Sequence, residues 1–180
     1  WFNTGDLGYL DENDCLYLSG RAKDLIIRSG HNIDPELIEE PLNSHPEVVT
    51  SVAIGLPDAY TGELPMAYVV LTQGSTLSEQ ALIDYAAGLI SERAAIPKRI
   101  DFLQEMPLTA VGKIFRPALR QRIAEEVVNG LLEKANIVAQ VSSENEKKRG
   151  LVIKAVAQDK SQIEAIKDLV KSYIFATDVS

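Results

Sequence analysis

A loop near residue 110 carries the side chain that is best suited to take part in a reaction. Residues 107–116 read PLTAVGKIFR, so Lys113 directly follows Gly112. A glycine can adopt positive φ and lets the backbone approach a ligand closely, while a lysine offers a mobile positive charge for phosphate or carboxylate oxygens. Because the same dipeptide is common in solvated turns, it does not establish a site by itself.

Two charged residues far upstream could take part in the same chemistry. Asp6 follows Thr4-Gly5, and its two acceptor oxygens suit the two hydroxyls of a ribose. Arg21 lies in the segment GRAKD at 20–24, and its planar guanidinium suits ribose or phosphate oxygens. Each could equally be an exposed charge at a turn, so the hypothesis of a nucleotide site depends on the segments acting together.

The hydrophobic pattern predicts an α+β fold built from short elements that position these residues. A hairpin is expected over 7–10 and 16–18, a strand over 25–27, a turn over 29–32, an antiparallel pair over 48–55 and 67–72, and a strand over 100–103. Helices are expected from Pro35 towards Ser44 with a kink or early end at Pro41, over 79–93 after the N-cap Ser78, and over 117–134. The last strand and helix flank the lysine loop.

After residue 134 the pattern restarts. Strands are expected over 137–141 and 151–156, a helix over 161–171 and a strand over 173–175, which together form a small ββαβ-like extension. The charged run 144–149 reads as the solvated tip of its hairpin.

Composition limits the function classes. Eighteen basic and 26 acidic residues give a net charge of −8, which disfavours nucleic acid or an anionic membrane as the main partner. One cysteine and two histidines leave no disulfide within the chain and no predicted metal site. The apolar stretches are far shorter than the roughly 20 residues of a membrane span. We therefore expect a soluble cytoplasmic protein, and the opening Trp1-Phe2 suggests a piece of a longer chain.

Taken together, the motifs resemble the carboxyl-terminal part of the adenylate-forming (AMP-binding) superfamily, which includes acyl-CoA synthetases, luciferases and the adenylation domains of peptide synthetases. The resemblance covers roughly residues 1–120. Residues 1–8 (WFNTGDLG) are similar to the family's Thr-Gly-Asp motif, 20–24 to its hinge motif and 107–116 to its catalytic-lysine motif. Three motifs in this order are far more specific than any one of them.

The resemblance implies a role for each candidate residue. Asp6 and Arg21 would bind the nucleotide, and Lys113 would bridge the acyl carboxylate and the α-phosphate while the adenylate forms. Thr109 and Gly112 would support the lysine loop. Asp24 would be the hinge on which a small domain swings between an adenylating and a thioester-forming pose. Gly30 and His31 would line the coenzyme A channel in the second pose.

The resemblance also implies an activity and a domain plan. The full enzyme would be an acid–thiol ligase that activates a fatty or aryl carboxylic acid with ATP and transfers the acyl group to coenzyme A, with Mg²⁺ arriving on ATP and not held by this chain. Residues 1–23 would end a large N-terminal domain, 24–129 would form the mobile C-terminal domain, and 130–180 would be a small α/β extension without an assigned role. Without the missing N-terminal domain, the chain alone is expected to be inactive.

Three alternatives stay open from the sequence. The acyl group could pass to a carrier-protein phosphopantetheine, or the acyl-adenylate could be released. The chain could also be a non-catalytic interaction module. The stretch 28–35 (RSGHNIDP) looks more like acyl-CoA synthetases than peptide-synthetase domains, which favours coenzyme A as the acceptor.

Overall fold

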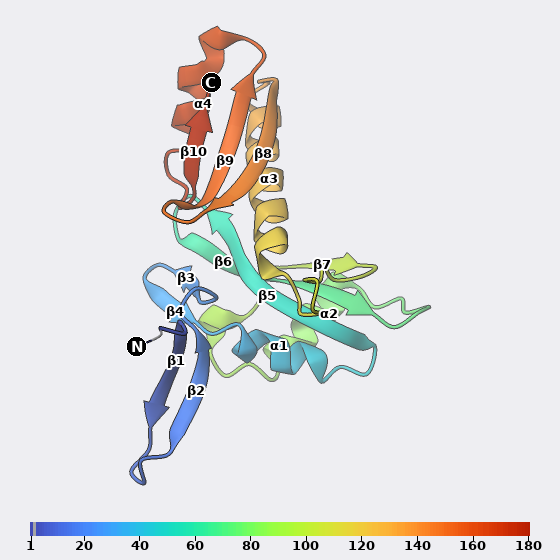
Figure 1. Cartoon of the computed structure of the whole chain (residues 1–180). Helices are drawn as coiled ribbons and strands as arrows, with labels where there is room; N and C mark the ends of the chain where they lie inside the picture. The colour runs from blue at the N-terminus through green and yellow to red at the C-terminus, as the bar shows by residue number, and fades with distance from the viewer. Residues whose placement is uncertain (2) are drawn as a thin grey trace. The chain divides into compact units, whose positions relative to one another are not determined.

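The structure is a computed structural model that describes residue 1 and residues 3–180, without the side chain of Ser19 (Figure 1). Phe2 of the first motif therefore lies outside the described residues. The chain forms two compact units, one made of residues 1–55 and 64–106 and the other of residues 56–63 and 107–180. The predicted α+β class is confirmed in both units.

The first unit begins with the predicted hairpin. Strand β1 (Asp6–Leu10) pairs antiparallel with β2 (Leu16–Arg21), and this register sets Asp6 opposite Arg21. The rings of Tyr9 and Tyr17 stack across the pair with centroids 5.3 Å apart. The hairpin therefore carries the first and second motifs side by side at its open end.

A mixed sheet follows, with strand order β4-β3-β6-β5 and with β7 added parallel to β6. Its strands are β3 (Ile26–Arg28), β4 (His31–Ile33), β5 (Val48–Asp58), β6 (Gly62–Leu71) and β7 (Arg99–Leu103). Strands β5 and β6 are longer than expected. The expected turn over 29–32 is shorter, because Ser29 and Gly30 both adopt positive φ, 52° and 79°, and His31 already begins β4.

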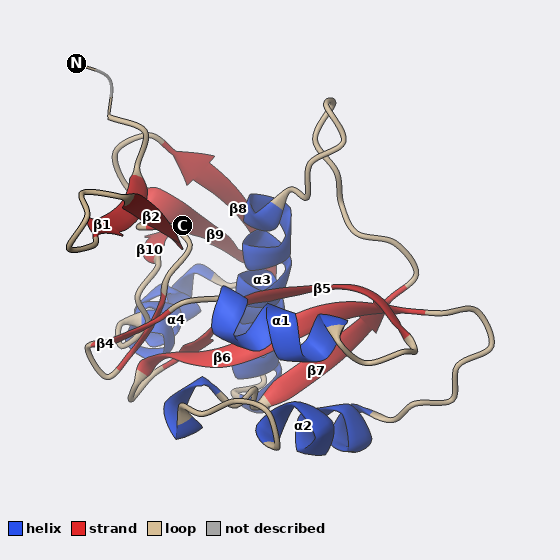
Figure 2. Cartoon of the chain, turned by 90° about the horizontal axis from the view of Figure 1, so that it is seen from below, coloured by secondary structure: helices blue, strands red, loops and turns tan. Residues whose placement is uncertain are grey.

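Helices α1 (Glu36–Asn43) and α2 (Glu79–Ala87) lie against this sheet, as Figure 2 shows. Pro41 lies inside α1 and does not end it, because the helix continues to Asn43. The expected early end at Pro41 is therefore not found. Ser78 caps α2 as predicted by accepting a hydrogen bond from the N–H of Ala81. The expected helix over 79–93 is wrong beyond Ala87. The chain turns at Gly88, and Ile90 enters the core from a non-helical segment.

The core of this unit is apolar and almost fully buried. Both helices and all five strands of this sheet contribute to it through Ile26, Ile33, Ile38, Leu42, Ala53, Ala67, Val69, Leu82, Ala86 and Ile100. This packing anchors the short strands β3 and β4, which present Gly30 and His31 at their connecting turn.

In the second unit, α3 (Arg116–Lys134) and α4 (Ile163–Val170) pack against a sheet of order β10-β9-β8. Strand β8 (Ala139–Glu146) is antiparallel to β9 (Gly150–Ala157), and β10 (Ala176–Val179) is parallel to it. The last strand lies at 176–179 and not at 173–175, because Phe175 turns into the core and stacks with Tyr173. The ββαβ order is as predicted.

The buried face of α3 does not follow a single row of apolar residues. Leu119, Ile123, Val127 and Leu131 recur at every fourth position of the sequence. The structure buries Leu119 and Ile123 but then Ala124, Val128 and Leu132. Since an α-helix has 3.6 residues per turn, a row spaced by four rotates away from the sheet, and the next row replaces it.

No helix among the described residues is long and apolar enough to cross a membrane.

Candidate active-site residues

Asp6 and Arg21 meet at the open end of the β1–β2 hairpin. The Arg21 Nε atom lies 3.0 Å from Asp6 Oδ1, and the side chains are 66% and 29% exposed, respectively. The N–H of Ala22 donates to the carbonyl of Gly5 at 3.1 Å and closes this end of the hairpin. The two predicted nucleotide-binding side chains are thus held together by strand register at an accessible position.

The predicted hinge residue follows directly. Asp24 lies half-buried in the turn after β2, where its N–H donates to the carbonyl of Arg21 at 2.9 Å. Gly20, at φ +107°, packs so closely against Asp34 that an added Cβ would lie 3.2 Å from Asp34 Oδ2. The other oxygen of Asp34 accepts the N–H of Glu36 at the start of α1. Because Gly20 has no Cβ, the chain just before Asp24 can lie close to Asp34.

Gly30 and His31 lie at the exposed tip of the β3–β4 hairpin, where Arg28 is registered opposite His31. The imidazole Nε2 of His31 pairs with Glu92 Oε1. The Arg28 Nη1 atom donates to the carbonyl of Ala94 at 2.8 Å. Sequence reasoning missed Glu92 and Ala94, since they lie more than sixty residues downstream and belong to no motif.

The lysine loop, which belongs to the second unit, is a tight hairpin. The N–H of Thr109 donates to the carbonyl of Lys113 at 2.7 Å, and the N–H of Lys113 donates back to Thr109 Oγ1 at 3.1 Å. Gly112 adopts φ +77° and donates its N–H to the carbonyl of Thr109. The side chain of Lys113 is exposed at the end of this loop, just before α3.

Other polar features of the second unit do not involve the predicted site residues. Arg149 binds Asp178 and Glu146 at 2.7 and 2.6 Å, and these hydrogen bonds lower the pKa of both carboxyl groups and raise the pKa of Arg149. No group of three His, Cys, Asp or Glu side chains suited to a metal occurs in the part of the chain that the structure describes.

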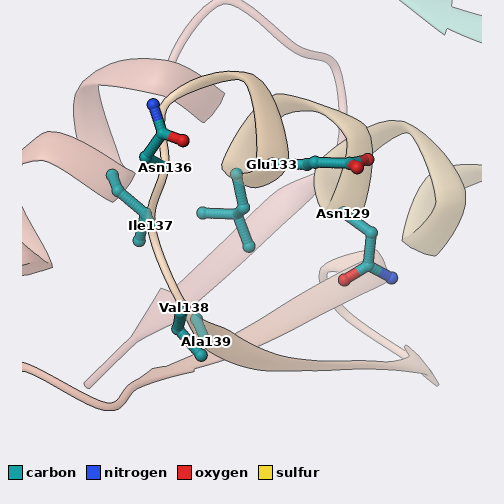
Figure 3. A pocket seen from close by; sticks show the side chains of 7 residues that line it. Asn129, Glu133, Asn136, Ile137, Val138 and Ala139 are labelled. Atoms are coloured by element: carbon teal, nitrogen blue, oxygen red, sulfur yellow. The ribbon is translucent and has the colours of Figure 1, made fainter.

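A hollow of about 430 Å³ lies where α3 ends and the chain turns towards β8. Figure 3 shows Asn129 and Glu133 on the helix and Val138 on the segment that follows it. The seven described residues that line it include no Lys, Arg or His, so the hollow offers no cation for a phosphate group.

Comparison with known proteins identifies the class. Residues 37–113 match the family described as the AMP-binding enzyme C-terminal domain. This part of the chain therefore resembles the C-terminal domain of AMP-binding enzymes. The match includes Thr109, Gly112 and Lys113, and it begins after Asp6, Arg21, Asp24, Gly30 and His31.

Among its relatives, a marinolic acid–CoA ligase of Pseudoalteromonas sp. (strain SANK 73390) is 52% identical over 133 residues, which are 74% of this chain and 20% of the ligase. A long-chain-fatty-acid–CoA ligase of Bacillus subtilis is 41% identical over 126 residues, 70% of this chain and 22% of the ligase. The solved o-succinylbenzoate CoA synthetase MenE from Bacillus subtilis, in complex with the acyl-adenylate OSB-AMP, superposes with a TM-score of 0.61. It is 38% identical, and the match covers 67% of this chain and 24% of that one.

This chain thus resembles the C-terminal domain of CoA ligases, as predicted, and it spans about a fifth of the length of these curated relatives.

Proposed function

We propose that the whole protein is an ATP-dependent acyl-CoA synthetase, which converts a carboxylic acid and ATP into an acyl-adenylate and pyrophosphate and then transfers the acyl group to coenzyme A. The observation that carries this proposal is the 52% identity with a CoA ligase together with a matched domain that includes the lysine loop. A fatty or aryl acid is the proposed substrate class, since relatives carry the names of such ligases.

In the first half-reaction, Lys113 acts between two anions. The acyl carboxylate and the α-phosphate repel each other, and a fixed ammonium between them stabilises the transition state, where their charge is concentrated. The reciprocal hydrogen bonds between Thr109 and Lys113 hold the backbone of the loop and leave the ammonium exposed. Asp6 and Arg21 bind the ribose and phosphate oxygens of the nucleotide. Mg²⁺ accompanies ATP and is held by groups outside this chain.

In the second half-reaction, the domain turns about Asp24. The pantetheine arm of coenzyme A then passes along Gly30 and His31, where the absence of a side chain at Gly30 allows close approach. Residues 1–23 end the large N-terminal domain, 24–129 form the mobile domain, and 130–180 extend it. The N-terminal domain supplies the acyl pocket, so this chain alone is inactive, and we place the enzyme in the cytoplasm.

The test compares the two half-reactions in the full-length parent, using wild type, Lys113→Ala and the control Lys148→Ala, which removes an exposed lysine between β8 and β9. Acid-dependent ATP–pyrophosphate exchange should fall about 100-fold or more in Lys113→Ala only, as expected for loss of a single transition-state contact. Transfer from supplied acyl-adenylate to coenzyme A should persist. If exchange in Lys113→Ala equals that of wild type, Lys113 is an ordinary loop residue.

The same assay separates the alternatives. Transfer to a carrier-protein phosphopantetheine in preference to coenzyme A would identify a carrier-loading ligase. Release of acyl-adenylate without any thioester would identify an adenylate-forming enzyme without the second step. No exchange with any acid would favour an interaction module.

A further inference from the structure

The tip of the β3–β4 hairpin is held by contacts from outside the hairpin. Its strands contain three residues each, and the turn between them places Ser29, a residue with a side chain, in the left-handed region at φ 52°. Such a conformation is unfavourable for residues other than glycine. It therefore depends on contacts around it.

Two side chains supply these contacts, and both reach the segment 92–95. Arg28 and His31 are directly opposite across the hairpin, so their side chains leave the same face of the strands. Arg28 Nη1 binds the carbonyl of Ala94 at 2.8 Å, and His31 Nε2 binds Glu92. The contact between His31 Nε2 and the Glu92 carboxyl group fixes the orientation of the imidazole ring.

We propose that Glu92 and Arg28 are positioning residues for the thioester-forming step. They clamp the tip to the segment 92–95, so that Gly30 and His31 present an ordered surface to the pantetheine arm of coenzyme A. This inference rests on the proposed function. Because the clamp orders the tip before coenzyme A binds, the free-energy cost of ordering it is not subtracted from the binding free energy.

The placement of the clamp separates this role from a purely structural one. The His31 and Glu92 side chains are 57% and 32% exposed, and exposed ion pairs contribute little to folding stability. The strands themselves are anchored by Ile26 and Ile33, which are fully buried. Loss of the clamp should therefore loosen the tip and leave the sheet intact.

The experiment uses the full-length parent and measures transfer from supplied acyl-adenylate as a function of coenzyme A concentration. Glu92→Ala should raise the KM for coenzyme A about tenfold, as expected when one or two side chains must be ordered on binding. Its ATP–pyrophosphate exchange should keep the wild-type rate. Glu92→Gln, which retains an acceptor for His31, should restore most of the affinity. The control Asp84→Ala, which removes an exposed carboxylate hydrogen-bonded to Gln80 in the same unit, should have the wild-type KM.

A double-mutant cycle adds a second criterion. If the pair acts as one unit, Glu92→Ala combined with His31→Ala should raise the KM no more than the stronger single variant. An unchanged KM in Glu92→Ala would overturn the clamp, as would a parallel loss of exchange, transfer and thermal stability. Absence of exchange in the wild type with every acid would overturn the proposed function itself, and the clamp with it.

Discussion

A substitution of Arg21 should have very different effects on folding stability and on nucleotide binding. Replacing Arg21 with alanine removes its ion pair with Asp6 and should leave the fold nearly unchanged. The guanidinium is 66% exposed, and pairs of this kind contribute about 0.2–1 kcal/mol to the free energy of unfolding. The backbone pairing of β1 with β2 does not depend on it.

The effect on nucleotide binding should be larger. A charge-assisted hydrogen bond to a ribose or phosphate oxygen contributes about 1.5–3 kcal/mol, and each 1.4 kcal/mol corresponds to tenfold in affinity. The full-length Arg21→Ala variant should therefore bind ATP roughly 10- to 150-fold more weakly.

Chemical denaturation of this chain and calorimetric titration of the full-length protein with ATP measure the two quantities. Arg149→Ala is the matched control, because it also removes an exposed arginine that binds a carboxylate, and its ATP affinity should equal that of wild type. A loss of more than about 2 kcal/mol of stability in Arg21→Ala would make the pair structural, well beyond an exposed ion pair. ATP affinity within twofold of wild type would remove Arg21 from the nucleotide site.

Further predictions concern stability. Gly130→Ala, inside α3 where an added Cβ meets nothing within 4 Å, should raise the free energy of unfolding by about 1 kcal/mol in denaturant titrations, whereas Gly112→Ala at φ +77° should lower it. Ile166→Ala, at a fully buried position of α4, should lower the free energy of unfolding by about 2–5 kcal/mol and increase amide hydrogen exchange in β9 and β10; unchanged exchange there would contradict the packing of the extension. Because Arg149 lowers the pKa of Asp178 and Glu146, their contribution to stability is present above the ordinary values of 3.8 and 4.5 and is lost as pH falls through the lowered ones. In Arg149→Met, NMR titration should find both pKa values raised towards the ordinary range, and unchanged values would exclude Arg149 as their cause.

The sequence predicted the elements around the candidate site better than their ends. The strand at 100–103, the helix after Pro117 and the hairpin holding Asp6 are all present, because alternation, capping residues and proline act within a few residues of each other. The end of α2 was missed because burial of Ile90 in the core competes with continuing the helix.

What the sequence determined by itself is local. The loop from Pro107 to Phe115 closes through bonds between near neighbours, and Gly112 supplies the positive φ that such a turn needs. Only the tertiary structure decided which distant residues contact the predicted site residues and the segments beside them. Glu92 reaches His31 across 61 positions, and Asp34 limits the space beside Gly20, because packing of α1 and α2 on the sheet brings these residues together. No spacing in the chain encodes such contacts, since they depend on how the whole core is filled.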